Sequence, residues 1–89
     1  MERRSVRFVG RVQGVGFRMT AREVAGECAL TGWVRNEPDG SVTMEIQGEP
    51  GKIEACLDSI ESRTAGRVDH RHEDKIPPVP SERGFEIRF

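Results

Sequence analysis

The segment Gly10–Arg18, GRVQGVGFR, combines glycines with an arginine in a pattern that could bind an anion. Gly14 and Gly16 permit a tight backbone turn, and the helix that we expect to follow adds further free N–H donors. Arg18 can offer a planar, permanently charged pair of donors to the same anion. We therefore expect one phosphate group to be held by the side chain of Arg18 and by the backbone N–H groups of Gln13, Gly14, Val15, Gly16, Phe17 and Arg18.

Two other phosphate-binding motifs do not fit this segment. A Walker loop requires Lys and then Ser or Thr after its last glycine, whereas Phe17 and Arg18 follow Gly16 here. A dinucleotide-binding fingerprint requires a third glycine at the position of Met19. Taken alone, the short glycine motif is equally compatible with an ordinary strand-to-helix turn that carries a surface arginine.

The second segment of interest is Gly32–Gly40, GWVRNEPDG, in which a short strand ends at Asn36 before a turn. Turn chemistry alone makes Asn36 an ordinary hairpin residue. We expect its strand to run opposite to the first strand of the chain. The sequence by itself therefore does not place Asn36 beside the glycine loop.

Apolar periodicity predicts the elements that must position these residues. Alternating apolar residues indicate strands at 6–12, 42–47 and 85–89, and apolar residues spaced as one helical face indicate two helices. Residues 32–36 form a short strand, and the polar, extended residues 68–73 an edge strand. The order βαββαβ plus a C-terminal strand predicts an α+β split βαβ sandwich, with both helices on one face of a five-stranded, largely antiparallel sheet. At 89 residues we expect a single domain over 1–89. The expected strands cover residues 6–12, 32–36, 42–47, 68–73 and 85–89. The first expected helix covers about 18–29, and the second opens at 48–51 and carries an apolar stripe over 53–60.

The two segments together resemble the acylphosphatase family. Val12–Arg18 matches the family pattern Val-Gln-Gly-Val-x-Phe-Arg at every fixed position. Gly32–Asn36, followed by Asp39-Gly40, matches its second pattern, Gly-Trp-Val-x-Asn with a later Asp-Gly. The order of the two motifs, their spacing and the length of the chain also fit.

The resemblance implies a ferredoxin-like fold and hydrolysis of the carboxyl–phosphate bond of acyl phosphates to carboxylate and inorganic phosphate. It implies that Arg18 and the loop N–H groups of Gln13–Arg18 bind the phosphoryl group and that Asn36 holds the attacking water. It also implies that no metal, cofactor or covalent phosphoenzyme takes part. Inorganic phosphate is then the product and a competitive inhibitor. The resemblance, and not the spacing, puts Asn36 beside Arg18.

Charge and surface pattern bear on a rival interpretation, an RNA-binding module. The 14 basic and 15 acidic residues give a net charge of −1, which excludes a globally basic nucleic-acid binder. Residues 1–35 nevertheless carry a net positive charge and residues 36–89 a net negative one. An RNA-recognition sheet presents aromatic residues on its central strands, and the expected outer faces of strands 6–12 and 42–47 have none. We expect the arginines of the first strand simply to face water: Arg3, Arg4, Arg7 and Arg11.

A third interpretation is the acylphosphatase-like domain at the start of a long hydrogenase maturation carbamoyltransferase. We favour the free-standing enzyme, because the chain has 89 residues and lacks zinc-finger cysteines. No stretch approaches the roughly 18 apolar residues of a membrane span, and the N-terminus does not read as a signal peptide. We therefore expect a cytoplasmic monomer that binds neither nucleic acid nor membranes.

A few further residues invite interpretation. Cys28 and Cys56 are expected to be free, buried thiols facing one core, and whether they can pair is left open. His70 and His72 share one face of an edge strand, but no third metal ligand is identifiable, so we expect them to be solvated. Trp33 is expected in the core or at its boundary.

Overall fold

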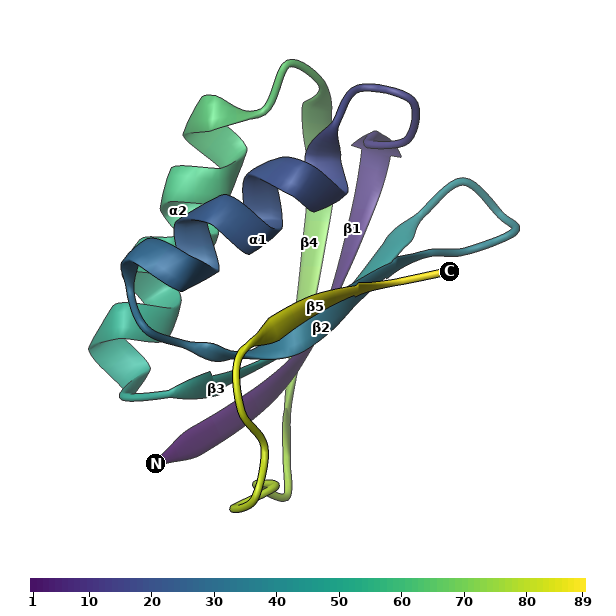
Figure 1. Ribbon diagram of the computed structural model, residues 1–89. Coiled ribbons are helices and arrows are strands. Elements are labelled where there is room, and N and C mark those ends of the chain that lie inside the picture. The colour runs from purple at the N-terminus through teal and green to yellow at the C-terminus, as the bar shows by residue number, and fades with distance from the viewer.

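The computed structural model describes residues 1–89, and its elements follow the predicted order (Figure 1). The elements are β1 (Glu2–Arg11), α1 (Phe17–Glu27), β2 (Thr31–Asn36), β3 (Val42–Gly48), α2 (Pro50–Arg63), β4 (Arg67–Ile76) and β5 (Phe85–Arg88). The strands form one sheet of order β4-β1-β3-β2-β5, in which β2 and β5 are parallel and the other neighbours antiparallel. Both helices cover one face of this sheet, as the α+β prediction requires (Figure 1).

The apolar stripes that predicted the helices are the faces that the helices bury. One core of 16 buried residues lies between the helices and the sheet. Within it the rings of Phe8 on β1 and Phe17 on α1 meet edge to face, with 4.9 Å between their centroids. Because aromatic pairs of this geometry add to the gain from burial alone, this contact holds the first turn of α1 against β1.

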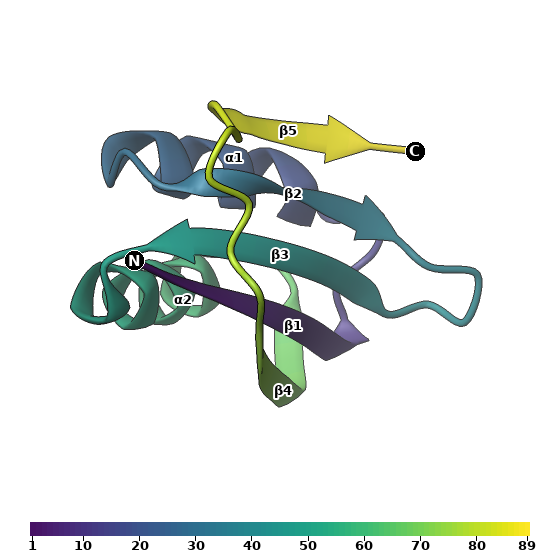
Figure 2. The same cartoon turned by 90° about the horizontal axis from the view of Figure 1, so that it is seen from below.

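The direction of β2 differs from the sequence-based expectation. β1 and β2 both pair antiparallel with β3, one on each side of it, so β1 and β2 are parallel to each other. The expectation was wrong because the β2–β3 hairpin places β3, and not β2, directly against β1. Figure 2 shows that the C-terminal ends of β1, β2 and β5 all lie at the same end of the sheet. The glycine loop after β1 and the end of β2 therefore lie on one side of the molecule.

The face of the sheet away from the helices is partly covered. The segment after β4 crosses it on the way to β5 (Figure 2). Gln47 on β3 fixes this segment, because its side chain donates to the carbonyl of Val79 at 2.9 Å and accepts the Val79 N–H at 2.7 Å. Arg3 was expected to face water, but only 2% of it is exposed, and it pairs with Glu45 and Glu82. Local alternation could not show that a distant segment would cover this arginine.

The remaining sequence-based interpretations concern cysteines and Trp33. Cys28 and Cys56 are free thiols, and Cys56 is fully buried. Burial, with the neighbouring Cys28 thiol, raises the pKa of Cys56 to about 12, so its reactive thiolate is scarce at neutral pH. Trp33 is buried as predicted, with the guanidinium groups of Arg35 and Arg88 over its ring at 5.1 and 4.8 Å. Neither helix is long and apolar enough to cross a membrane.

Candidate active site

The loop between β1 and α1 takes its shape from two glycines and three apolar anchors. Gly14 and Gly16 have φ angles of 72° and 73°, in the left-handed region that residues with a side chain rarely adopt. Val12 and Phe17, at the two ends of the loop, are almost completely buried, and Val15 packs partly against the core. These three side chains therefore anchor the loop to the core, while the backbone at Gly14 and Gly16 stays at the surface.

The backbone N–H groups of residues 14–19 donate no hydrogen bond within the chain. The first bond of α1 runs from the N–H of Thr20 to the carbonyl of Gly16 at 3.0 Å, so the N–H groups of residues 14–19 are free. Free N–H groups in a glycine turn and at a helix start both attract anions, the latter with the added field of the helix dipole. The loop therefore offers a preformed set of donors large enough for a phosphate group.

Arg18 lies in the first turn of α1, beside these donors. Its Nη1 donates to the carbonyl of Arg88 at 3.2 Å, and its guanidinium carbon is 4.9 Å from the centroid of the Phe89 ring. No carboxylate lies within ion-pair distance, and no enclosed pocket surrounds the loop. The charge of Arg18 is thus not neutralised by the protein, and most of its donors are free for a ligand.

Asn36 is the last residue of β2, on the same side of the strand as Val34, which is the side that the helices cover. It is half-buried and shares its β3 partner, Val42, with Phe8 of β1. The C-terminal parts of β1 and β2 are consequently two strand spacings apart, about 10 Å. The preceding residue, Arg35, pairs with Arg88, whose carbonyl Arg18 contacts. Asn36 and Arg18 therefore adjoin the same end of β5.

The side chain of Gln13 joins the loop to the β2–β3 hairpin. Its Nε2 donates to the carbonyl of Glu37 at 2.7 Å and to the carbonyl of Ser41 at 2.8 Å. Sequence reasoning assigned a role to the N–H of Gln13 and missed this side chain. The signal was not local, because the two acceptors lie 24 and 28 residues further along the chain. Gln13 fixes the distance between the loop and the strand that carries Asn36.

The two carboxylates that follow Asn36, those of Glu37 and Asp39, already accept hydrogen bonds from neighbouring side chains. The Arg35 guanidinium lowers the pKa of Glu37, and the Thr43 hydroxyl adds to this effect. Hydrogen bonds from Ser41, together with the ion pair to Arg7, lower the pKa of Asp39 to about 2. Carboxylates of such low pKa are weak bases. Neither is suited to remove a proton from water beside Asn36.

We predict that Gln13→Ala lowers stability by about 1–2 kcal/mol, because the carbonyls of Glu37 and Ser41 each lose one of two hydrogen-bond donors. We also expect hydrolysis of a synthetic acyl phosphate to lose about tenfold in kcat/KM, since the loop and Asn36 are no longer held at a fixed separation. Gln47→Ala is the matched control. Its amide also binds distant backbone, but far from the loop, so stability should fall while kcat/KM stays unchanged. A Gln13→Ala variant that is less stable yet turns over normally would show that the two hydrogen bonds of the Gln13 side chain serve stability only.

The histidine pair lies away from this region. The rings of His70 and His72 are 6.1 Å apart on β4, and both residues are exposed. No group of three or more His, Cys, Asp and Glu side chains is arranged to hold a metal ion.

Comparison with known proteins identifies the family of this chain. The acylphosphatase family model matches residues 4–87. An acylphosphatase from Geobacillus thermodenitrificans is 41% identical over 90 residues, which cover 100% of this chain and 96% of that protein. The crystal structure of acylphosphatase from Bacillus subtilis superposes with a TM-score of 0.94 over the whole of both chains, at 26% identity. The chain therefore belongs to the acylphosphatase family. Membership of this family supports hydrolysis of acyl phosphates as its activity.

The same fold also occurs inside a much longer protein. In full-length HypF, solved in a phosphate- and nucleotide-bound form, a region superposes with a TM-score of 0.89 at 29% identity. The match covers 99% of this chain but 12% of that one. The acylphosphatases named above, in contrast, match this chain over nearly their full length.

Proposed function

We propose that this protein is a metal-independent acylphosphatase whose site is the loop after β1 together with Asn36. The proposal rests chiefly on one observation, the row of free N–H groups at residues 14–19 beside an arginine that no carboxylate neutralises. An acyl phosphate carries its negative charge on the phosphoryl oxygens, and such a cradle is complementary to them. Residues 1–89 then form one functional domain.

Arg18 and the N–H groups of Gln13 to Arg18 bind the phosphoryl group in this proposal. Phosphoryl transfer depends mainly on positioning and on stabilising spread negative charge. The cradle supplies that charge from backbone dipoles and one guanidinium, which is the contribution that a metal ion makes in other phosphoryl-transfer sites. Arg18 exchanges its contact with the Arg88 carbonyl for a phosphoryl oxygen when substrate binds.

Asn36 positions the attacking water. The water oxygen forms a bond to phosphorus, the bond from phosphorus to the acyl oxygen breaks, and the carboxylate leaves with that electron pair. A carboxylate is a stable leaving group, so no general acid is required. The water loses its proton to a phosphoryl oxygen of the substrate, because Asn36 is neutral and the nearby carboxylates are weak bases. The products are a carboxylate and inorganic phosphate, and the reaction forms no phosphoenzyme.

The experiment that tests this function is hydrolysis of benzoyl phosphate by purified protein, with and without a chelator. We expect turnover that a chelator leaves unchanged and that inorganic phosphate inhibits competitively. Activity that disappears with chelator and returns with a divalent ion contradicts metal independence. The RNA-binding alternative instead requires salt-dependent affinity for an RNA oligomer without turnover.

The remaining parts of the proposal concern partners and location. We infer a cytoplasmic monomer that acts on small acyl phosphates and binds neither nucleic acid nor membranes. The arginines of β1 support this interpretation, because most of them are held in ion pairs with the protein's own carboxylates and form no free basic stripe. Sedimentation of the purified protein tests the monomer.

A further inference from the structure

The arginines of this chain fall into two groups by their ionic partners. Most of them contact a carboxylate within 4 Å: Arg3, Arg4, Arg7, Arg35, Arg63, Arg67, Arg71 and Arg88. The arginines outside these pairs are Arg11, Arg18, Arg22 and Arg83. The paired arginines have little charge left to offer to a ligand, whereas the unpaired ones keep theirs.

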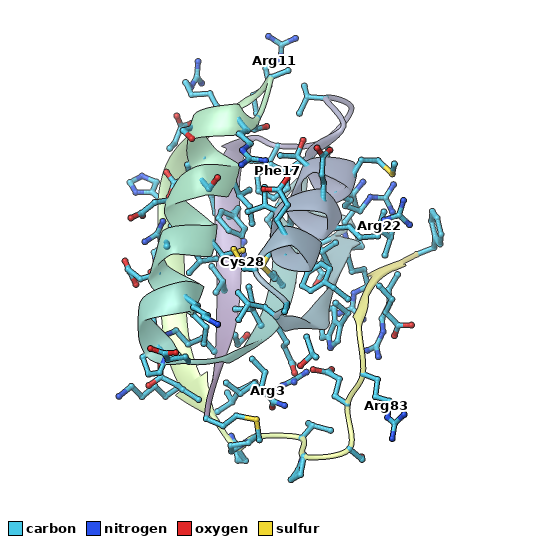
Figure 3. All side chains as sticks on the ribbon, turned by 60° about the vertical axis from the view of Figure 1, so that its left-hand side comes forward. Arg3, Arg11, Phe17, Arg22, Cys28 and Arg83 are labelled. Atoms are coloured by element: carbon cyan, nitrogen blue, oxygen red, sulfur yellow. The ribbon has the colours of Figure 1, made fainter.

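Three of the unpaired arginines surround the candidate active site. Arg11 ends β1 just before the loop, Arg18 lies in the first turn of α1, and Arg22 follows one turn later. In Figure 3 Arg11 lies above the helices and Arg22 on the flank of α1, while Arg83 lies at the opposite end of the molecule. Among the arginines, those without a carboxylate partner therefore lie on β1 or α1 next to this site, except for Arg83.

The side chain of Arg22 reaches back toward the first turn of α1. Its Nη2 contacts the sulfur of Met19 at 3.5 Å, so the guanidinium points back along α1 toward the first turn. Residues four apart lie on the same flank of a helix, which puts Arg22 on the flank of Arg18 and about 6 Å further along the axis. Arg22 and Met19 are both exposed. A ligand held by Arg18 can thus reach Arg22 across the surface.

We propose that Arg22 is a specificity-determining residue that binds a second anionic group on the acyl part of the substrate. This inference rests on the proposed function and names its substrate class: acyl phosphates whose acyl group carries its own negative charge. An extended four-carbon dicarboxylic acyl phosphate separates its phosphorus from its free carboxylate by roughly the distance between Arg18 and Arg22 along the helix. The guanidinium of Arg22 then forms a paired contact with that carboxylate.

The test compares succinyl phosphate, which has the second carboxylate, with acetyl phosphate, which lacks it. We expect Arg22→Gln to raise KM for succinyl phosphate about three- to tenfold, the scale of a partly exposed ion pair, and to leave acetyl phosphate within about twofold. Arg83→Gln is the matched control, because it removes an equally unpaired charge far from the loop. It should leave both substrates unchanged, as should Arg11→Gln. All three side chains lie at the surface, so the variants should fold.

Each other outcome overturns the inference. An equal effect of Arg22→Gln on both substrates shows that Arg22 does not contact the acyl group. The same selective loss in Arg83→Gln shows a diffuse field in place of a contact, and in Arg11→Gln it puts the second anion on the other side of the loop. Wild-type protein that hydrolyses neither substrate contradicts the proposed function itself, and the inference with it. Succinyl phosphate hydrolysis that Arg22→Gln leaves unaffected contradicts the inference alone.

Discussion

Arg18→Lys is expected to lower kcat/KM for benzoyl phosphate by about a hundredfold or more while the protein stays folded. Lysine keeps the positive charge but cannot donate two parallel hydrogen bonds to a phosphoryl group. Losing one preorganised donor to the transition state costs about this much in other enzymes. The structure separates this effect from stability, because Arg18 makes one side-chain hydrogen bond and no ion pair within the chain. Stability should therefore change by no more than about 0.5 kcal/mol.

Arg83→Lys provides the control for this substitution. Arg83 is also without a carboxylate partner but lies at the far end of the molecule (Figure 3). It should keep wild-type turnover and wild-type inhibition by phosphate. Arg18→Lys should bind phosphate far more weakly, and circular dichroism should show an unchanged fold. Near-normal turnover and phosphate inhibition in the lysine variant would mean that the site does not use the planar guanidinium.

Asn36→Ala should lower kcat by about a hundredfold or more and leave the affinity for inorganic phosphate close to that of the wild type. The amide contacts the water and not the phosphoryl group, so its loss affects the transition state more than the bound ground state. The measurements are kcat and the inhibition constant of phosphate. They separate Asn36 from Arg18, whose replacement should affect both.

Two controls keep this prediction open to failure. Asn36 ends β2 at the start of a hairpin, so a folding defect could also lower activity, and the midpoint of denaturation must be measured in parallel. Asn36→Asp places a negative charge at the site and should weaken phosphate binding as well as turnover. An alanine variant that is folded, binds phosphate and turns over at the normal rate would leave Asn36 as a hairpin residue only.

Most elements of the fold were predictable because each buries its own apolar face; β4 is the exception, a polar strand at the edge of the sheet. The stripe from Phe17 to Cys28 and the alternation from Val42 to Ile46 report burial within one element, without knowledge of its neighbours. The pairing of strands is not a local property. The direction of β2 relative to β1 was consequently wrong, and so was the exposure of Arg3, whose carboxylate partners lie 42 and 79 residues away.

In the candidate site, too, the local features were predictable and the contacts between distant segments were not. Gly14 and Gly16 predict a turn rich in free N–H groups, and the structure has such a turn there. The proximity of Asn36 to that loop depended on the family resemblance, since the expected strand direction gave no reason for it. Gln13 illustrates what remained hidden. Its two side-chain hydrogen bonds to the β2–β3 hairpin form only because the C-terminal ends of β1 and β2 lie at the same end of the sheet.

The central claim, that the loop after β1 and Arg18 hold the phosphoryl group, is tested most directly by titrating ¹⁵N-labelled protein with inorganic phosphate. The chemical shifts of the backbone amides are followed by NMR. We predict that the largest changes fall on residues 14–19, that they saturate with a dissociation constant equal to the inhibition constant of phosphate for benzoyl phosphate hydrolysis, and that Arg18→Lys weakens them. Loop amides that stay unperturbed while phosphate inhibits hydrolysis, or changes centred near Arg83 at the far end of the molecule, would contradict the account.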